Sequence, residues 1–103
     1  MSKLSLTEFE RSVLAELKNI PLGRVTTYQN LAKRLGKPNA ARAVGNALNK
    51  NPHAPKVPCH RVVKSNGEIG GYVFGIKKKI GILKSESVEV KDGRVLNFEK
   101  IVI

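Results

Sequence analysis

Residues 26–49, with the sequence TTYQNLAKRLGKPNAARAVGNALN, contain two short helical patterns joined by a tight turn. Thr26 is the predicted N-cap of the first helix, and Gly36 is predicted to end that helix. Asn39 in the connector is the predicted cap of the second helix, which spans residues 40–49. Two short helices joined in this way are typical of a helix-turn-helix, although an ordinary helical hairpin fits the same pattern.

The second helix has two contrasting faces. Its narrow apolar face is formed by Ala43, Val44, Ala47 and Leu48, and its outward face by Arg42, Gly45, Asn46 and Asn49. A small outward residue such as Gly45 allows a nucleic-acid backbone or groove to come close to the helix. Arg42, Gly45 and Asn46 are therefore candidate DNA-binding residues.

The net charge favours the DNA-binding interpretation. The chain has 19 Lys and Arg residues against 8 Asp and Glu residues, which gives a formal net charge of +11. A small domain this basic is expected to bind polyanions, nucleic acid first among them, with an affinity that falls as salt rises. A lysine-rich surface without a specific partner is the alternative. An anionic membrane is disfavoured, because no basic amphipathic helix carries large apolar anchors.

The length of 103 residues suits one small domain covering residues 1–103. The sequence has no apolar run long enough to cross a membrane, and residues 1–4 lack the apolar core of a secretory signal. A single cysteine favours a reducing compartment, so we expect a cytoplasmic or nucleoid-associated protein. One Cys and two His do not make a structural zinc site, so we expect no metal and no cofactor. A monomer is the default expectation.

Helix and hairpin signals lie on both sides of the central unit. Capping boxes at Ser5 and at Thr7 precede apolar residues at helical spacing, which predicts an N-terminal helix that ends before Pro21. A strand is predicted over residues 61–64, and residues 66–67 (Asn-Gly) predict a hairpin directly after it. A hairpin that follows a helix-turn-helix resembles the wing of a winged-helix domain.

The C-terminal third contains a fourth helix and a last pair of strands. Ile76, Ile80 and Leu83 mark that helix. Its exposed side is predicted to carry Lys77, Lys78, Lys79 and Lys84. Two short strands are predicted around residues 92–93 (Asp-Gly). The predicted fold class is therefore mainly α with short β strands, a winged helix-turn-helix DNA-binding domain.

Residues 57–63, with the sequence VPCHRVV, hold the only cysteine of the chain. Pro58 disfavours helix in the residue before it, and residues 62–63 are predicted to start a strand. Cys59 is therefore expected on extended backbone where a loop enters a sheet. The thiolate is the nucleophilic form of cysteine, and a neighbouring imidazole such as His60 favours it. Side chains alternate between faces on extended backbone, so Cys59 and His60 would need a bridging water or a bend in the backbone to interact. A buried structural thiol is the alternative.

Three motifs stand at informative spacings: residues 40–45 (AARAVG), 51–52 (NP) and 58–63 (PCHRVV). Together they resemble the O6-alkylguanine-DNA alkyltransferase family, also called methylated-DNA–protein-cysteine methyltransferases. The resemblance runs from about residue 7 to residue 86 and covers the DNA-binding, active-site domain of that family. The N-terminal domain common in the family has no counterpart in this sequence, so any metal site or support that it supplies is missing.

The resemblance implies a mechanism. The family flips O6-alkylguanine out of the duplex and transfers the alkyl group to a cysteine, here Cys59, in an irreversible single-turnover reaction. A histidine, here His60, activates that cysteine through a water, and a glutamate, here Glu86, orients the histidine. A solvated acid at the end of a helix is the alternative role of Glu86.

The resemblance also implies a binding site for DNA. Tyr28 matches the tyrosine that assists base flipping and contacts the guanine, with helix packing as its alternative role. Arg42 matches the arginine that replaces the flipped base in the stack, although an arginine on a recognition helix commonly contacts phosphate. Family members approach duplex DNA through its minor groove. The resemblance therefore implies double-stranded DNA that contains O6-alkylguanine as the partner, bound from the minor-groove side.

Further contacts around the base are implied in the same way. Asn51 would brace the active-site turn that begins at Pro58, and Leu48 would line the alkyl pocket. The backbone carbonyls of Cys59 and Val62 would accept hydrogen bonds from the guanine amine.

Val73 and Phe74 are the main departure within the matched region. The backbone N–H of Val73 would bind the guanine O6, but many members have small or polar residues at these two positions. The bulk of Val73 and Phe74 is therefore predicted to narrow the pocket and to favour methyl over larger groups.

Three other functions fit parts of the sequence. The first is a non-catalytic damage-recognition protein, like the alkyltransferase-like branch of the family, whose members are also short. That branch replaces the acceptor cysteine, often by tryptophan, whereas this chain has Cys59. A winged-helix transcription factor would prefer a defined duplex sequence and leaves residues 58–61 unexplained. A Cys–His hydrolase would need an oxyanion hole, for which no motif is evident, and leaves the charge unexplained.

Overall fold

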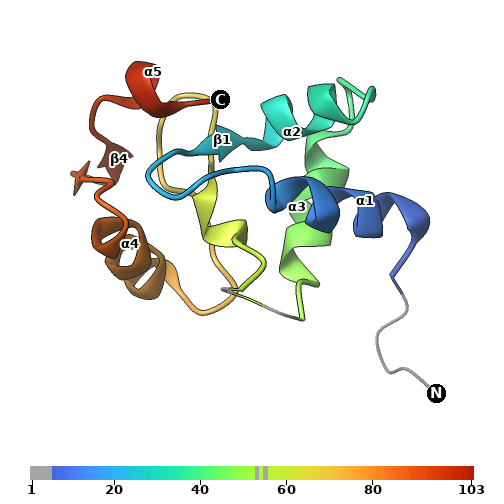
Figure 1. Cartoon of the computed structure of the whole chain (residues 1–103), viewed down its shortest axis with the longest axis horizontal. Coiled ribbons are helices and arrows are strands. Elements are labelled where there is room, and N and C mark those ends of the chain that lie inside the picture. The colour runs from blue at the N-terminus through green and yellow to red at the C-terminus, as the bar shows by residue number, and fades with distance from the viewer. Residues whose placement is uncertain (1–5, 53, 55) are drawn as a thin grey trace.

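Three helices form the N-terminal half of the protein (Figure 1). The structure is a computed structural model of the chain and describes residues 6–52, 54 and 56–103. Helices α1 (Glu8–Leu17), α2 (Tyr28–Arg34) and α3 (Ala41–Asn49) pack together, with α3 in contact with both of the others. Their shared core contains Val13, Leu17, Leu31 and Val44, all fully buried. These helices correspond to the predicted N-terminal helix and helix-turn-helix.

The helix starts differ in part from the predicted caps. At α1 the capping box of Thr7 is confirmed, because Thr7 Oγ1 accepts from the Glu10 N–H (3.1 Å) and Glu10 Oε1 accepts from the Thr7 N–H (2.9 Å). The alternative box at Ser5 lies outside the described residues. The cap of α2 is Thr27 rather than Thr26, whose hydroxyl donates to the Ile103 carbonyl (2.9 Å). Helix α3 begins after Ala40 without a side-chain cap from Asn39.

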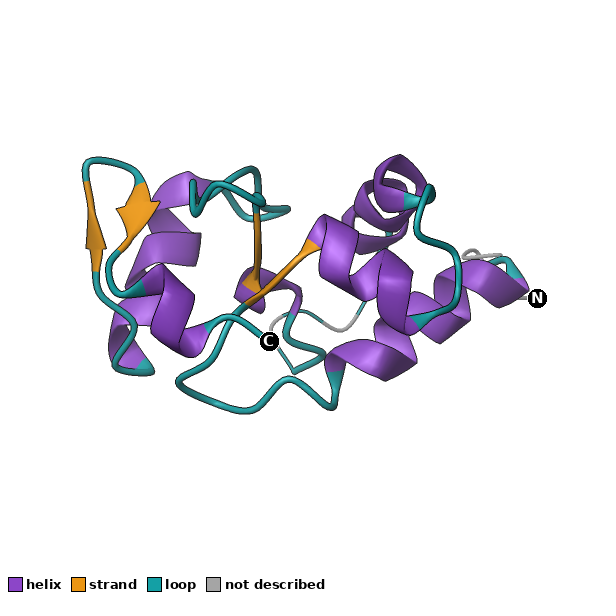
Figure 2. Ribbon diagram, turned by 90° about the horizontal axis from the view of Figure 1, so that it is seen from above, coloured by secondary structure: helices purple, strands orange, loops and turns teal. Residues whose placement is uncertain are grey.

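A short parallel pair of strands lies at the centre of the molecule (Figure 2). Strand β1 (Thr26–Thr27) pairs with β2 (Val62–Val63), and Val25 beside β1 forms a further bridge to Val102 near the end of the chain. Successive strand residues point to opposite sides, so Val62 packs into the core of the three helices and Val63 into a second core. The strand pair thereby joins the two halves of the protein.

The second half is built around α4 (Ile76–Ser85), which lies on the other side of β1 from the three helices (Figure 1). Beside it are the antiparallel strands β3 (Val90–Lys91) and β4 (Arg94–Val95), which confirm the predicted strands around Asp92 and Gly93. A last short helix, α5 (Phe98–Ile101), was not predicted. The protein is therefore mainly helical with short strands, as expected.

The predicted wing has a different strand partner. Residues 64–68 make a tight turn, in which the Lys64 N–H donates to the Glu68 carbonyl (2.8 Å). The returning segment then pairs with β4, because Glu68 bridges Arg94 and the Ile69 N–H donates to the Gly93 carbonyl (2.9 Å). The hairpin of β3 and β4 thus pairs with residues 68–69, whose backbone edge would be exposed in an isolated wing.

No helix in the described part of the chain is both long and apolar enough to span a lipid bilayer.

Candidate active site

A pocket of about 490 Å³ opens between α2, α3 and the loop of residues 71–73. Its lining includes these predicted site residues: Tyr28, Arg42, Gly45, Asn46, Leu48, Cys59 and Val73. The lining residues without a predicted role are Ala41, Asn49, Gly71 and Tyr72. The fold therefore gathers residues from α2, from α3 and from the loop of residues 71–73 around one cysteine.

Cys59 lies on a bent turn, not on the predicted extended backbone. Residues Cys59–Arg61 form a 3₁₀ turn, η1, that ends where β2 begins at Val62. Pro58 precedes the turn, and the Cys59 N–H bonds back to the Val57 carbonyl (2.8 Å). Only 5% of Cys59 is exposed. The bend replaces the strand alternation that would have placed Cys59 and His60 on opposite faces.

Burial raises the pKa of the Cys59 thiol. Two nearby groups act in the opposite direction: a hydrogen bond from the Asn51 side chain and the positive charge of Lys79. Asn51 is itself buried, and its Nδ2 donates to the Val57 carbonyl (2.8 Å), which ties the end of α3 to the start of the turn. Cys59 is therefore a neutral thiol near pH 7, and its proton must be removed before the sulfur can act as a nucleophile.

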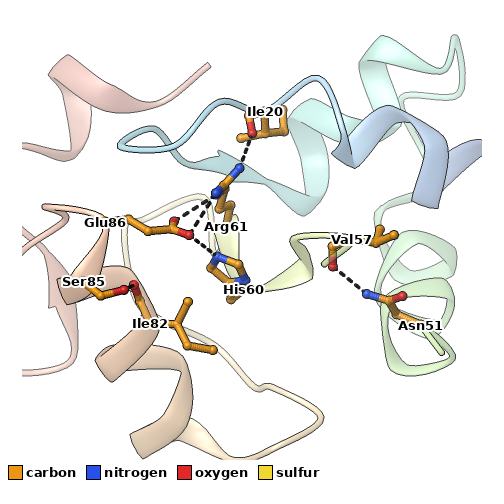
Figure 3. A network of polar contacts seen from close by, with 8 residues as sticks. All are labelled: Ile20, Asn51, Val57, His60, Arg61, Ile82, Ser85 and Glu86. Atoms are coloured by element: carbon orange, nitrogen blue, oxygen red, sulfur yellow. Dashed lines mark hydrogen bonds and ion pairs between the residues drawn. The ribbon is translucent and has the colours of Figure 1, made fainter. Parts of the chain in front are cut away.

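A buried network of polar groups joins His60 and Arg61, the two residues after Cys59, to Glu86 (Figure 3). His60 Nε2 lies 2.9 Å from Glu86 Oε2, and the Arg61 guanidinium forms a bidentate ion pair with the same carboxylate (2.9 Å for each bond). Arg61 also donates to the Ile20 carbonyl (2.7 Å). Burial disfavours the charge of Glu86, but the bonds from Arg61 and His60 outweigh it and lower the pKa of this carboxyl.

These contacts decide which nitrogen of His60 carries the proton. An ionised carboxylate only accepts hydrogen bonds, so His60 Nε2 must donate to Glu86. Burial lowers the pKa of His60, although the hydrogen bond and the charge of Glu86 act in the opposite direction. The ring is therefore neutral near pH 7, and Nδ1 has a free lone pair.

Two buried side-chain polar atoms among the described residues have no hydrogen-bond partner in the protein: His60 Nδ1 and Tyr72 Oη. The two rings meet edge to face, with centroids 6.4 Å apart. The pKa of Tyr72 is raised by burial, by the charge that Cys59 has as a thiolate and by the charge of Glu86, so the Tyr72 hydroxyl lies within electrostatic reach of the cysteine. Buried polar atoms of this kind are typical of a site that binds a water or substrate.

Tyr28 stands at the start of α2 and lines the pocket from the side of the central strands. A Cβ placed on Gly70 would lie 3.1 Å from its hydroxyl, and one placed on Gly45 would lie 3.9 Å from its ring. Gly70, at φ +73°, therefore leaves the room that the Tyr28 hydroxyl needs. Burial, and the charge of Cys59 in its thiolate form, raise the pKa of Tyr28, so the Tyr28 hydroxyl is protonated and can donate a hydrogen bond.

The rim of the pocket is open to solvent. Arg42 and Asn46 project from α3 as exposed residues, as predicted, whereas Ala43 is exposed rather than part of the apolar face. Val73 is 45% exposed and lines the pocket, but Phe74 does not line it and packs edge to face on Tyr72 at 5.7 Å. Of the two bulky residues, only Val73 is thus placed to narrow the pocket.

Five predicted site residues lie behind the pocket wall: Asn51, Pro58, His60, Val62 and Glu86. The prediction missed Arg61, Tyr72 and Lys79. Arg61 was part of the quoted motif but carried no signal of its bond to Glu86, 25 residues away. Lys79 was predicted on the exposed side of its helix and is fully buried.

The site has no evident metal centre. Within residues 6–52, 54 and 56–103, no three His, Cys, Asp or Glu side chains come together in a way that could hold a metal ion.

The comparisons with known proteins identify the family. The family model described as "6-O-methylguanine DNA methyltransferase, DNA binding domain" matches residues 8–88. This chain belongs to the 6-O-methylguanine DNA methyltransferase family. The matched region contains the whole pocket and the buried network, while β3, β4 and α5 lie beyond it.

Curated members of the family are similar in sequence. A methylated-DNA–protein-cysteine methyltransferase of Methanosarcina acetivorans is 51% identical over 80 residues, which is 78% of this chain and 51% of that protein. A protein of the same name from Saccharomyces cerevisiae is 49% identical over 80 residues, 78% of this chain and 43% of that protein. The chain spans about half the length of these curated relatives.

Two solved structures differ in how much of their length the chain matches. Mycobacterium tuberculosis OGT in complex with DNA has a TM-score of 0.76 and 43% identity, over 80% of this chain and 51% of that one. S. pombe Atl1, in complex with damaged DNA containing O6-carboxymethylguanine, has a TM-score of 0.84 and 30% identity, over 96% of this chain and 97% of that one. Of these two matches, the second extends over almost the full length of both chains.

Proposed function

We propose that this protein repairs alkylated DNA by binding duplex DNA with O6-alkylguanine, flipping the damaged base into the pocket beside α3, and transferring the alkyl group irreversibly to Cys59. One observation carries the proposal: Cys59 lines the pocket, and the next residue, His60, has an unprotonated and unpartnered Nδ1. The family membership and the methyltransferase names of the relatives support this substrate class.

The transfer balances without a cofactor. The Cys59 sulfur attacks the alkyl carbon, a sulfur–carbon bond forms, and the carbon–O6 bond breaks with its electron pair moving to the guanine. Cys59 loses one proton and the guanine gains one, so the base leaves as neutral guanine. The thioether that remains is stable, so each protein molecule acts once.

The buried network suits His60 to the role of general base. The bidentate Arg61 pair keeps Glu86 ionised, and Glu86 in turn holds the proton of His60 on Nε2. His60 Nδ1 is then free to accept the Cys59 proton, with a water bound between His60 Nδ1 and Tyr72 Oη as the relay. The Tyr28 hydroxyl lines the same pocket and donates to the leaving guanine.

The DNA lies along the rim formed by α3. Arg42 and Asn46 are exposed beside the pocket mouth, and the net charge of +11 supplies attraction to phosphates. Arg42 occupies the space of the flipped base, and the protein approaches as a monomer through the minor groove. Base edges in the minor groove distinguish sequences poorly. A repair protein has to act in any sequence, so this approach suits it.

Damage recognition without transfer is a second candidate. The match to S. pombe Atl1 favours it, because the match extends over 96% of this chain and that protein is seen bound to damaged DNA. The raised pKa of Cys59 agrees with a slow nucleophile. The cysteine itself, which damage recognition does not require, favours transfer.

The two candidates differ in what happens to the DNA. With protein in twofold excess over a duplex with one O6-methylguanine, transfer converts all of the lesion to guanine, as nucleoside analysis would reveal. With a tenfold excess of duplex, conversion stops at one lesion per protein. Cys59→Ala binds the duplex and removes nothing. Tight binding of the wild-type protein without any loss of O6-methylguanine would support damage recognition instead.

A further inference from the structure

Residues 101–103 form a short extended segment that pairs in parallel with the chain at the start of β1. The Val25 N–H donates to the Ile101 carbonyl (3.1 Å), and the Ile103 N–H donates to the Val25 carbonyl (2.8 Å), on either side of the bridge between Val25 and Val102. Arg24 Nε donates to the same Ile101 carbonyl (2.9 Å). The segment lies beyond residue 88, where the match to the family model ends.

The Ile103 carbonyl is held by two side chains that flank Tyr28 in the sequence. Thr26 Oγ1 donates to it (2.9 Å), and Asn30 Nδ2 donates to it as well (3.2 Å). Thr26 is fully buried, and Asn30 is partly buried. A carbonyl oxygen has two acceptor lone pairs, so these two donors satisfy it. The segment therefore contacts the chain both before and after Tyr28.

The first turn of α2, which carries Tyr28, depends on such contacts. The helix has only seven residues, and a helix this short is not stable on its own. Its cap is the Thr27 hydroxyl, which accepts from the Asn30 N–H (2.9 Å). Asn30 is thus held through its backbone by the cap and through its side chain by Ile103. The C-terminal segment fixes this turn from outside the helix.

The position of Tyr28 leaves little room for movement. A Cβ placed on Gly70 would lie 3.1 Å from the Tyr28 hydroxyl, and one placed on Gly45 would lie 3.9 Å from the Tyr28 ring. A shift of the turn would therefore press the hydroxyl against residue 70 or withdraw it from the pocket. Misplacing a group that contacts the substrate by about 1 Å can slow a reaction by as much as about 100-fold.

We propose that residues 101–103 are a positioning element of the transfer site, in which the Ile103 carbonyl, bound by Thr26 and Asn30, fixes the turn that carries Tyr28 and so holds the Tyr28 hydroxyl at the pocket. This inference rests on the function proposed above, in which that hydroxyl donates to the leaving guanine. A purely structural contact would affect stability alone, whereas a positioning contact affects the rate of transfer in the folded protein.

The side chain of Thr26 offers a sharp test. Thr26→Val removes the hydroxyl and keeps the shape of the side chain, and Thr26→Ser keeps the hydroxyl. Ser12→Ala is the control, because it removes a hydroxyl that donates over the same distance (2.9 Å) to the Glu8 carbonyl on exposed α1. Each substitution is made in the wild type and together with Tyr28→Phe. The measurements are single-turnover transfer at saturating duplex, alkylation of Cys59 by iodoacetamide, and urea unfolding.

The expected result is a loss that depends on the Tyr28 hydroxyl. Thr26→Val slows transfer at saturating duplex about fivefold, because the hydroxyl is misplaced. Alkylation of Cys59 by iodoacetamide changes by less than about twofold in the same variant, as do both rates in Thr26→Ser and Ser12→Ala. In the Tyr28→Phe background, Thr26→Val slows transfer by less than about a further twofold, because no hydroxyl is left to misplace.

The position of Tyr28 can also be followed without DNA. The chain has two tyrosines and no tryptophan, so Tyr72→Phe leaves Tyr28 as the sole tyrosine fluorophore. Quenching of its fluorescence by acrylamide reports how accessible the ring is to solvent. Adding Thr26→Val to this background should raise the quenching constant, and adding Ser12→Ala should leave it unchanged.

Other outcomes overturn the inference. Folded Thr26→Val that transfers at the wild-type rate would contradict it, even if the variant were less stable. An equal slowing by Thr26→Val in the wild type and in Tyr28→Phe would show that the contact does not act through the hydroxyl. If Thr26→Val does not fold, Asn30→Ala removes the other donor and decides by the same measurements. If the wild-type protein transfers nothing, the proposed function fails, and acrylamide quenching still decides whether the segment positions Tyr28.

Discussion

The rim of the pocket and the network behind Cys59 are built in opposite ways. On the rim, Arg42 and Asn46 are exposed on α3. Behind Cys59, His60 and Glu86 are buried. The Glu86 carboxylate accepts hydrogen bonds from the His60 ring and from the Arg61 guanidinium. The contrast agrees with the proposed function, in which the rim binds DNA while the network holds the reacting groups at fixed positions.

The largest effect on stability is expected from Glu86→Gln. The amide of Gln would face the donors of His60 and Arg61 with a donor of its own and would leave the guanidinium without its counter-charge. Breaking a buried ion pair in this way costs about 3 kcal/mol of unfolding free energy. Urea unfolding measures it, with Glu89→Gln as the control at an exposed acid nearby. A cost below about 1 kcal/mol would contradict a tightly held network.

Arg42→Ala should show the reverse pattern on the rim. Because Arg42 is exposed, its loss should change the unfolding free energy by less than about 0.5 kcal/mol. Affinity for a duplex with one O6-methylguanine should fall about tenfold, through the loss of one groove or phosphate contact. Fluorescence anisotropy measures the affinity. The control is Arg11→Ala, which removes the same charge from the exposed side of α1. Equal losses for both variants would mean that charge alone matters.

Acid should weaken the buried network before it affects the rim. The folded pKa of His60 is lowered mainly by burial, so the unfolded chain binds more protons and stability falls as the pH drops below about 6.5. The lowered pKa of Glu86 adds a second loss at more acidic pH, below about 4.3. Thermal unfolding between pH 7 and pH 5 measures the first step. His60→Gln should flatten it, and an equally steep fall in that variant would rule out His60 as its source.

Gly45→Ala should have the smallest effect, at the place where rim and pocket meet. A Cβ at this position would lie 3.9 Å from the Tyr28 ring, which is an ordinary contact, and alanine favours helix over glycine by up to about 1 kcal/mol. The variant should therefore be as stable as the wild type or slightly more stable. Affinity for DNA should fall a few fold if α3 approaches the groove closely. A loss of stability would instead assign Gly45 to packing.

The sequence predicted the parts of the fold that local signals determine. The capping box of Thr7, the helices on both sides of residue 36 and the strands around Asp92 and Gly93 all depend on residues close together in the chain. Even there the exact cap was misplaced, because Thr26 and Thr27 both have a hydroxyl group. Only the fold shows that Thr27 caps α2 while the Thr26 hydroxyl donates to the distant Ile103 carbonyl.

The features that were missed depend on long-range contacts. Lys79 has the pattern of an exposed lysine, and its burial requires three carbonyls brought together from residues 62, 69 and 71. The bidentate pair of Arg61 with Glu86 and the pairing of residue 68 with β4 are of the same kind. A sequence motif selected the cysteine and its neighbours, but only the fold reveals which groups hold them in place.

The most direct test of the account is to locate the alkyl group after reaction. The protein is incubated with an equimolar duplex that contains one O6-methylguanine, and its intact mass and peptide map are then measured. The account predicts a gain of one CH₂ on each molecule, confined to Cys59 and absent with an unmodified duplex. An unchanged mass in a protein that still binds the lesion, or a methyl group on another residue, would contradict it.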